Sequence, residues 1–259
     1  MTVLTDKEFI RRRFSDAASH YRDFADIQDV IARELVVRAN VARDMSVLDV
    51  GAGDGRMAQV LIDAGAHVIA VDGAWGMASL GLRRSPHAAW LQADAALLPF
   101  ASRSFDTVIS SSVYQWVDDL PGAFAQVRRV LKPGGRFMVA MFGHNTLDEL
   151  FVSMDRAARS SGKSLPALRR LPSVARVREA LYQAGFQEPV VEVERRTTRF
   201  QDIKAILVWL KGIGANALTR KFFWGRAFLA ATQKEYRVSF PQGDKLRATF
   251  EIIWIEAKV

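Results

Sequence analysis

The chain has 259 residues, of which 49% are hydrophobic, and a formal net charge of +8 at neutral pH. This composition supports a packed core and excludes a disordered chain. No 18-residue stretch is uncharged and apolar, and the first residues lack the apolar segment of a secretory signal, so we expect a cytoplasmic protein without a membrane span. Without cysteine there are no disulfides, thiolate metal sites or cysteine nucleophiles, and four scattered histidines argue against a zinc site.

The excess positive charge lies in the second half of the chain. Residues 1–145 contain 16 basic and 16 acidic residues, whereas residues 146–259 contain 20 and 12. Between Arg195 and Arg237 there are ten basic residues and two acidic ones, interspersed with Trp and Phe. Such a segment either docks an acidic partner or forms a solvated basic face over aromatic core residues.

The first 40 residues are predicted to be largely helical. Residues 6–40 contain few helix breakers, and their apolar residues recur at helical spacing. Phe14 and Tyr21 stand seven residues apart and would share one helical face. This leader either packs as a helix on the domain or forms a lid whose Tyr21 reaches a bound ligand.

A short strand over residues 47–50 leads into a glycine turn, Gly51-Ala52-Gly53-Asp54-Gly55. Closely spaced glycines let the backbone approach a ligand, and a helix N-terminus follows. The next strand ends at Asp72, 23 positions beyond Asp49. A carboxylate there can accept from both hydroxyls of a ribose, although a strand-end aspartate can also serve only as a cap.

Strands and helices then alternate along the chain. The expected strands are 67–72, 89–94, 104–111 and 136–142, and the expected helices are 56–63, 75–84 and 120–131. This alternation predicts a Rossmann-like α/β fold with a doubly wound, mostly parallel sheet. Ligands bind outside the carboxyl ends of such strands, which makes Gln115 and Trp116, just after residue 111, candidate site residues.

The second half departs from simple alternation. Helices are expected over 147–161 and 173–184, strands over 189–194 and 247–255, and a basic helical insertion at about 200–240. No internal repeat or low-complexity linker interrupts the chain. We therefore predict one domain over residues 1–259. Its parts are a helical leader or lid (1–40), a cofactor-binding core (41–145) and a C-terminal half with the insertion (146–259).

The spacing of the glycines distinguishes between cofactors. Dinucleotide sites have the pattern G-x-G-x-x-G, whereas this turn reads G-x-G-x-G with Asp49 before it and Asp54 inside it. Carboxylates there would repel a pyrophosphate and favour a cationic ligand. The segment resembles motif I of the class I S-adenosylmethionine-dependent methyltransferases, and Asp72, Asp94-Ala95 and Phe105-Asp106 stand where that superfamily has its later motifs.

This resemblance implies a site for S-adenosylmethionine, with S-adenosylhomocysteine as product and no metal. In the superfamily the glycine loop approaches the methionine part, the residue matching Asp72 holds the ribose, and the one matching Asp94 contacts the adenine. The implied cofactor-binding residues are Tyr21, Gln28, Asp49, Gly51, Ala52, Gly53, Gly55, Asp72, Gly73, Asp94, Ala95, Ser110 and Ser111.

The flanking segments resemble a narrower family, the malonyl-acyl-carrier-protein O-methyltransferases of biotin synthesis. The similarity extends from Phe14 to Ile252 and rests most strongly on L-K-x-x-G-A at 210–215, then on Gln-Trp at 115–116 and F-x-x-A-A-x-x-Y at 14–21. Departures are small. Ser112-Val113-Tyr114 replaces a stretch that more often contains Asn, and Phe250 stands where Tyr is common.

The narrower resemblance implies methyl transfer to the free carboxylate of a malonyl thioester, carried by acyl carrier protein or coenzyme A. This carboxylate is ionised at neutral pH and is itself the nucleophile, so no general base is needed. Candidates for orienting and shielding it are Tyr21, Gln115, Trp116 and Lys211. Candidates for binding the acidic, malonyl-phosphopantetheine-bearing carrier protein are Arg195, Arg196, Arg199, Arg220, Lys221 and Arg226.

Other functions fit part of the sequence. A nucleic-acid methyltransferase would also be basic, but the chain has no N/D-P-P-Y-type motif and no recognisable RNA-binding element, so we expect no nucleic-acid partner. A methyltransferase acting on another small molecule would share the cofactor motifs. A module that binds cofactor and carrier protein without turnover would share them too, but it would form no product.

Overall fold

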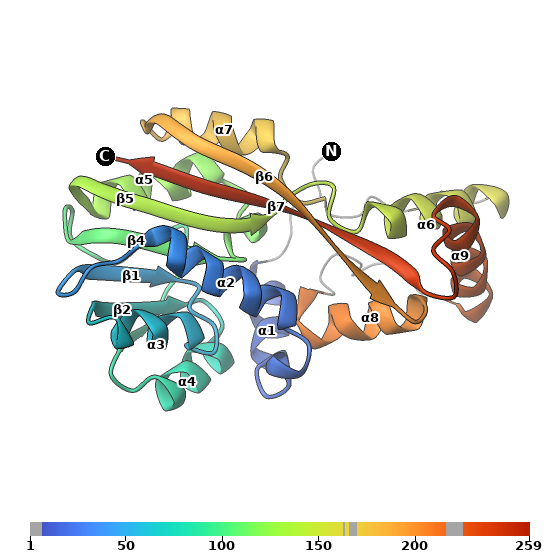
Figure 1. Ribbon diagram of the computed structural model, residues 1–259, viewed down its shortest axis with the longest axis horizontal. Helices are drawn as coiled ribbons and strands as arrows, with labels where there is room; N and C mark the ends of the chain where they lie inside the picture. The colour runs from blue at the N-terminus through green and yellow to red at the C-terminus, as the bar shows by residue number, and fades with distance from the viewer. Residues whose placement is uncertain (1–6, 163, 166–169, 216–224) are drawn as a thin grey trace.

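The fold is built around one seven-stranded sheet in the order β3-β2-β1-β4-β5-β7-β6 (Figure 1). The computed structural model describes residues 7–162, 164–165, 170–215 and 225–259. The strands are β1 (Ser46–Val50), β2 (His67–Asp72), β3 (Ala89–Gln92), β4 (Phe105–Ser111), β5 (Leu131–Phe142), β6 (Gln187–Phe200) and β7 (Leu246–Lys258). β1 to β5 pair in parallel, while β7 runs antiparallel to β5 and β6. The predicted doubly wound, mostly parallel sheet is confirmed.

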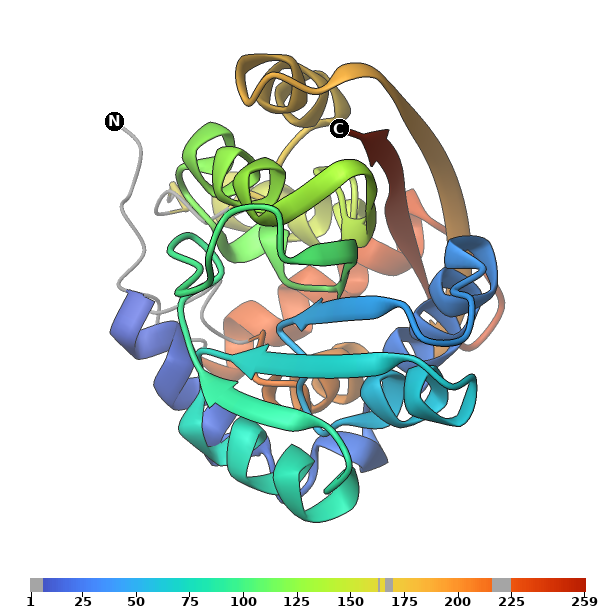
Figure 2. The same ribbon diagram turned by 90° about the vertical axis from the view of Figure 1, so that its left-hand side faces the viewer.

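The strand order reverses direction between β1 and β4, where the chain has left β1 for β2 and β3 and then returned (Figure 2). Val47, Leu48 and Val50 of β1 are fully buried, as expected for a strand covered on both faces. Such a reversal leaves a crevice outside the carboxyl ends of the two strands, which is where open α/β sheets bind ligands.

Helices pack on both faces of the sheet and beyond its ends. They are α1 (Lys7–Ala17), α2 (Asp26–Ala39), α3 (Arg56–Asp63), α4 (Trp75–Arg84), α5 (Leu120–Val130), α6 (Asp148–Ser160), α7 (Val174–Gln183), α8 (Ile203–Gly212) and α9 (Arg226–Ser239). One apolar core joins the sheet to α2 and α3 and continues into α6, α8 and α9. A second core lies on the opposite face, under α5 and α7.

The leader is not one continuous helix. It consists of α1, a turn at 18–20, the short 3-10 helix η1 (Tyr21–Asp23), and α2. The apolar residues that suggested one helix belong mainly to α2, whose Ile31 and Leu35 are buried against the sheet. α1 instead lies beyond the ends of the strands, beside α4 (Figure 1).

The strands β6 and β7 are longer than predicted and extend past β5 as a two-stranded ribbon. β5 pairs with β7 only as far as Phe142 opposite Ile252, whereas β6 continues to Phe200 opposite Leu246. The added part of β6 is rich in Arg and Thr on an exposed edge, so apolar patterning does not reveal it. The ribbon carries α8 and α9 away from β1 (Figure 1).

We predict that Gly76→Ala will release α1 from α4 without unfolding the sheet. The Gly76 N–H donates to Ser15 Oγ at 3.1 Å, and a Cβ at Gly76 would lie 2.5 Å from the Ser15 backbone oxygen. Because alanine favours a helix by about 1 kcal/mol over glycine, α4 itself should persist. Hydrogen exchange across residues 7–17 should become faster while the melting temperature changes little.

Leu82→Ala, on the exposed side of the same helix, is the control and should leave exchange in α1 unchanged. Unaltered protection of residues 7–17 in Gly76→Ala would show that this close approach does not hold α1 in place.

Candidate active site

The glycine turn is tied to β2 by two hydrogen bonds. The Val71 oxygen accepts from Gly51 N at 2.7 Å and from Ala52 N at 2.9 Å. Gly51 and Gly53 have φ values of 73° and 58°, a region that other residues rarely occupy. A Cβ at Gly51 would lie 2.0 Å from Val113, whereas one at Gly53 would meet only the Gly51 oxygen, at 4.0 Å. Gly53 therefore leaves open space above the loop for a ligand.

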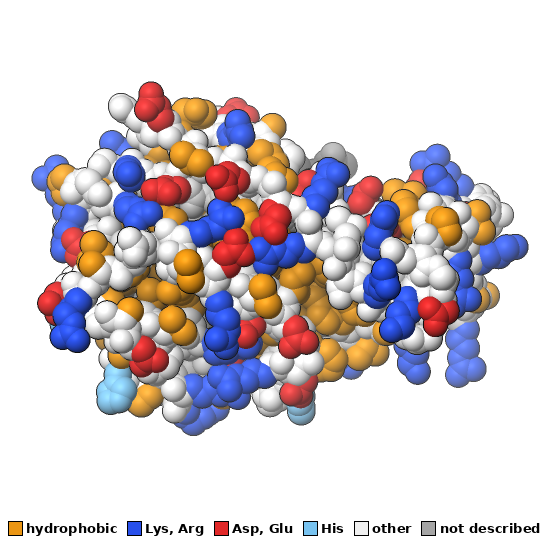
Figure 3. Space-filling model, viewed as in Figure 1, with side chains coloured by type: hydrophobic (Ala, Val, Ile, Leu, Met, Phe, Trp, Pro, Cys, Tyr) orange, Lys and Arg blue, Asp and Glu red, His pale blue; other side chains and the backbone are white. Residues whose placement is uncertain are grey.

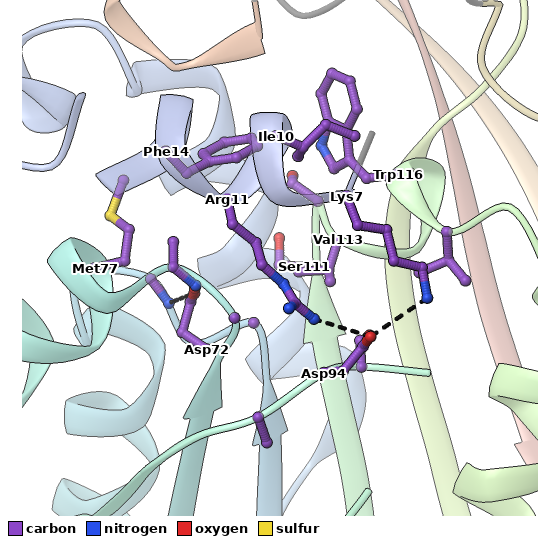
Figure 4. A pocket seen from close by; sticks show the side chains of 18 of the residues that line it. Lys7, Ile10, Arg11, Phe14, Asp72, Met77, Asp94, Ser111, Val113 and Trp116 are labelled. Atoms are coloured by element: carbon purple, nitrogen blue, oxygen red, sulfur yellow. Dashed lines mark hydrogen bonds and ion pairs between the residues drawn. The ribbon is translucent and has the colours of Figure 1, made fainter. Parts of the chain in front are cut away.

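A pocket lies over this turn, outside the carboxyl ends of β1, β2 and β4 (Figure 4). We call it the cofactor pocket. Trp116 lines it, together with eight of the predicted cofactor-binding residues, namely Tyr21, Gly51, Gly53, Asp72, Gly73, Asp94, Ala95 and Ser111. These eight come from segments up to 90 positions apart, and the crossover of the chain at β1 and β4 brings them together.

Asp72 ends β2 with both carboxylate oxygens held by the backbone. Oδ2 accepts from Gly53 N at 2.9 Å and Oδ1 accepts from Ala74 N at 2.7 Å. Burial outweighs these bonds and raises the pKa of Asp72 to about 6. The two backbone bonds fix the carboxylate in place. Each of its oxygens can accept a second hydrogen bond, so the carboxylate can still take two hydroxyl donors.

Asp94 is contacted by two cations of α1, as the dashed lines in Figure 4 show. Its Oδ2 lies 2.9 Å from Arg11 Nη2 and 3.3 Å from Lys7 Nζ, and its Oδ1 accepts from Ala96 N at 2.9 Å. Partial burial opposes ionisation, but this amide and the two cations hold the pKa of Asp94 below its usual value. Sequence reasoning did not single out Lys7 or Arg11, because only the tertiary fold brings α1 over the pocket.

The role inferred for Asp54 is corrected by the structure. Its side chain does not line the cofactor pocket and is ion-paired with Arg22, Arg84 and Arg56, at 2.8, 2.8 and 3.2 Å. Asp54 therefore does not favour a cationic ligand directly, because three arginines already balance its charge.

Asp49 is also absent from the wall of the cofactor pocket. It is fully buried, and neither carboxylate oxygen has a hydrogen-bond partner in the described structure. Burial and the nearby Asp72 raise its pKa well above the usual value. We therefore place Asp49 beneath the loop, as part of its support.

Four further predicted residues lie outside the cofactor pocket. Ser110 Oγ donates to the Val50 oxygen at 2.8 Å and links β4 to β1. Ala52 is buried within the turn, and Gly55 packs against Trp90 where α3 begins. Gln28 lines a neighbouring pocket instead.

That neighbouring pocket, which we call the substrate pocket, adjoins the cofactor pocket. Both are lined by Phe14, Tyr21, Ser112 and Trp116. Its other walls are mostly apolar and come from α6, α8 and the β6–β7 ribbon. Gln115 also lines this pocket, and its Nε2 donates to the Ser112 oxygen at 2.9 Å. Burial raises the pKa of Tyr21, so its hydroxyl stays protonated and can donate a hydrogen bond.

Lys211 does not line either of these pockets, contrary to the prediction. It is exposed on α8 and lines a separate surface hollow with Arg13 and Asp16. Arg170, which the sequence analysis did not select, lines the substrate pocket instead. Its guanidinium lies 4.3 Å from the centre of the Phe151 ring and 3.3 Å from Asp148.

The predicted partner-binding arginines differ in their surroundings. Arg196 pairs with Glu34 and with Glu194, so it stabilises the edge of the sheet and is not a free docking group. The Arg195 side chain is 67% exposed, with a weak 4.0 Å contact to Glu251. Arg199 and Arg226 are exposed. Arg220 and Lys221 lie outside the described residues.

Lys and Arg side chains gather at the end of the molecule formed by α6 and α9 (Figure 3). The exposed members of this basic end are Arg156, Arg159, Arg226, Lys234 and Arg237. No group of three or more His, Asp or Glu residues suited to a metal ion occurs in the described part of the chain. No helix among the described residues is long and apolar enough to cross a membrane.

Comparison with known proteins assigns the family. Residues 48–139 match the family described as "Methyltransferase domain". The malonyl-[acyl-carrier protein] O-methyltransferase of Xylella fastidiosa (strain M23) is 35% identical, over 98% of this chain and 88% of that protein. The enzyme of the same name from Methylovorus sp. (strain MP688) is 33% identical, over 97% of this chain and 88% of that protein.

A solved structure shares the fold. The Haemonchus contortus phosphoethanolamine N-methyltransferase 2 in complex with S-adenosyl-L-methionine is 20% identical, with a TM-score of 0.59, over 99% of this chain and 60% of that one. At this identity the likeness shows the fold alone. The near full-length similarity to the two relatives does more: this chain belongs to the malonyl-[acyl-carrier protein] O-methyltransferase family.

Proposed function

We propose that this protein transfers a methyl group from S-adenosylmethionine to the free carboxylate of malonyl-acyl carrier protein, giving the methyl ester that primes pimeloyl synthesis for biotin. The observation that carries the proposal is the pair of adjoining pockets with a shared wall of Phe14, Tyr21, Ser112 and Trp116. The cofactor pocket has the features of a nucleoside site, and the substrate pocket is lined mostly by apolar side chains. This arrangement suits a reaction between two bound molecules that must meet in line.

The residues of the cofactor pocket fit S-adenosylmethionine. Gly53 leaves open space beside the loop, Asp72 presents a fixed carboxylate to a ribose diol, and Asp94 lies where an adenine amino group would be held. When bound, the cofactor supplies a methyl group on a positively charged sulfur. The already ionised substrate carboxylate would be the nucleophile toward this methyl carbon, with S-adenosylhomocysteine as the leaving group, so the enzyme needs no basic residue to create the nucleophile.

The chain's own contribution is orientation and exclusion of water. Phe14 and Trp116 contact each other edge to face, with ring centroids 5.8 Å apart, and close the wall between the pockets. Tyr21 and Gln115 are positioned to donate hydrogen bonds without removing the charge of the nucleophile. Orientation of this kind supplies up to about 7–11 kcal/mol of barrier reduction. Arg170 replaces Lys211 as the cation that we assign to guiding the malonyl carboxylate inward.

The exposed arginines near the ribbon suit an acidic carrier protein. Arg199 lies near the end of β6, and Arg226 begins α9 at the basic end. Positive charge there would steer the acidic surface of the carrier protein toward the substrate pocket. We therefore propose Arg195, Arg199 and Arg226 as docking residues and leave Arg196 out of this set.

Incubation of malonyl-acyl carrier protein with S-adenosylmethionine and this protein should add one methyl group to the thioester. Intact-protein mass spectrometry measures the gain, and acetyl-acyl carrier protein, which lacks the free carboxylate, is the control. Labelling of RNA alone would favour a nucleic-acid methyltransferase. Binding of both ligands without product would favour a module that does not catalyse the reaction.

Affinity for S-adenosylhomocysteine should fall as the pH falls through 6. With its pKa raised to about 6, Asp72 is ionised at pH 7.5 and mostly protonated at pH 5, where it can no longer accept from both ribose hydroxyls. One proton with this pKa weakens binding roughly tenfold at pH 5. Calorimetry across this range measures the effect. Asp72→Asn should bind weakly with a flat pH profile, and a flat profile in the unaltered protein would remove this role.

Reversing the exposed docking charges should impair the carrier-protein substrate selectively. The pair Arg199→Glu and Arg226→Glu is expected to raise KM for malonyl-acyl carrier protein by about tenfold at low salt, since close charge pairs steer association. KM for malonyl-coenzyme A should stay within about twofold, because the pockets are unchanged.

Arg43→Glu makes the same charge reversal at an exposed residue just before β1, at the amino ends of the parallel strands, and is the matched control. Equal increases in KM for both thioesters, or the same increase in Arg43→Glu, would contradict docking at these arginines.

A further inference from the structure

Asp54 forms a buried ionic cluster that the cofactor motif does not explain. Its carboxylate side chain is 5% exposed, and it lines neither the cofactor pocket nor the substrate pocket. Three arginines contact it from three elements: Arg22 from η1, Arg56 from α3 and Arg84 from α4. A buried carboxylate needs a counter-charge, but it does not need three.

Two of these arginines belong to the Rossmann-like core, and one comes from the leader. Arg56 and Arg84 follow the glycine turn in the chain, and Arg56 also pairs with Asp29 at 3.0 Å. Arg22 instead reaches Asp54 from η1, 32 residues earlier in the chain. Arg22 Nε and Arg84 Nη1 contact the same Oδ2 oxygen at the same 2.8 Å. Asp54 therefore keeps two counter-charges if Arg22 is removed.

The segment that contains Arg22 has little structure of its own. η1 is a single turn in which no residue is fully buried, although Tyr21 is partly buried, and no side chain caps its start. Besides the packing of Tyr21 and Phe24 against the apolar core, two hydrogen bonds tie this segment to other elements. Arg22 fastens it to the glycine turn, and the Phe24 oxygen accepts from Trp209 Nε1 of α8 at 2.8 Å.

Tyr21 is the first residue of this turn, directly before Arg22, and it lines both pockets. Its side chain stands at the boundary where the methyl donor and the carboxylate must meet. A side chain on one short turn keeps a fixed position only if the turn itself is held to the rest of the fold. The Arg22–Asp54 pair supplies the attachment on the cofactor side.

We propose that Asp54 and Arg22 are positioning residues for methyl transfer, acting through Tyr21. The ion pair anchors η1 on the glycine turn, so that the loop which holds the cofactor also sets the place of the tyrosine that faces the substrate. This inference rests on the proposed function. In this proposal Asp54 holds η1 in position, whereas the sequence analysis expected its charge to favour a cationic ligand.

Arg22→Gln and Arg84→Gln are a matched pair that tests the inference. Each removes one 2.8 Å bond to the same oxygen and leaves Asp54 with two arginines. Arg22→Gln should lower kcat for malonyl-acyl carrier protein by about tenfold, as expected when a reacting group loses its orientation. It should also weaken S-adenosylhomocysteine binding by several-fold and speed hydrogen exchange at residues 18–24. Arg84→Gln should change none of these by more than twofold.

A double-mutant cycle with Tyr21→Ala separates positioning from a general loss of stability. If Arg22 acts through Tyr21, adding Arg22→Gln to Tyr21→Ala should lower kcat no further. A full additional loss in that background, or equal effects of Arg22→Gln and Arg84→Gln, would overturn the proposal.

Failure of the proposed function gives a different result. If the unaltered protein methylates no malonyl thioester, the exchange and S-adenosylhomocysteine-binding measurements still compare the two arginines. Faster exchange at residues 18–24 in Arg22→Gln alone would then support the anchor without the reaction. Identical exchange in both variants would contradict the anchor whatever the substrate.

Discussion

A single carbonyl oxygen fixes the turn on which both pockets depend. The Val71 oxygen accepts from two successive amides of the glycine turn and so binds the end of β1 to the end of β2. The backbone can follow this path only because Gly51 and Gly53 adopt positive φ. The same geometry brings Gly53 N to Asp72, so loop and carboxylate hold each other in place. Ligand recognition here follows from backbone conformation before any side chain is considered.

The sequence was sufficient to predict the features that depend only on residues close together in the chain. The strands of the first half, the glycine turn and the position of Asp72 all follow from local patterns, and the structure confirms this part of the fold. Lys211 illustrates the limit: its motif is specific, but only the packing of α8 decides which side of that helix faces the pocket. Arg170 and Arg11 carried no signal, because each reaches its pocket through a long-range approach that no short motif records.

The two acidic residues of the glycine motif show why the charge of a ligand cannot be inferred from the residue types of a motif alone. Both were expected to face a cation, yet Asp49 is buried under the loop and Asp54 is neutralised by arginines. Those arginines lie at sequence separations of 2, 30 and 32 residues, so most of the compensation is invisible in the motif. A carboxylate's partners must be known before its charge can be attributed to ligand binding.

The position of α1 has a kinetic consequence. Its Lys7 and Arg11 close over Asp94 at one pocket, while its Phe14 forms part of the wall of the other. A movement of α1 large enough to admit or release a nucleoside therefore also removes one side of the acyl site. We infer that the exchange of the two ligands is coupled, because residues of this one helix line both pockets.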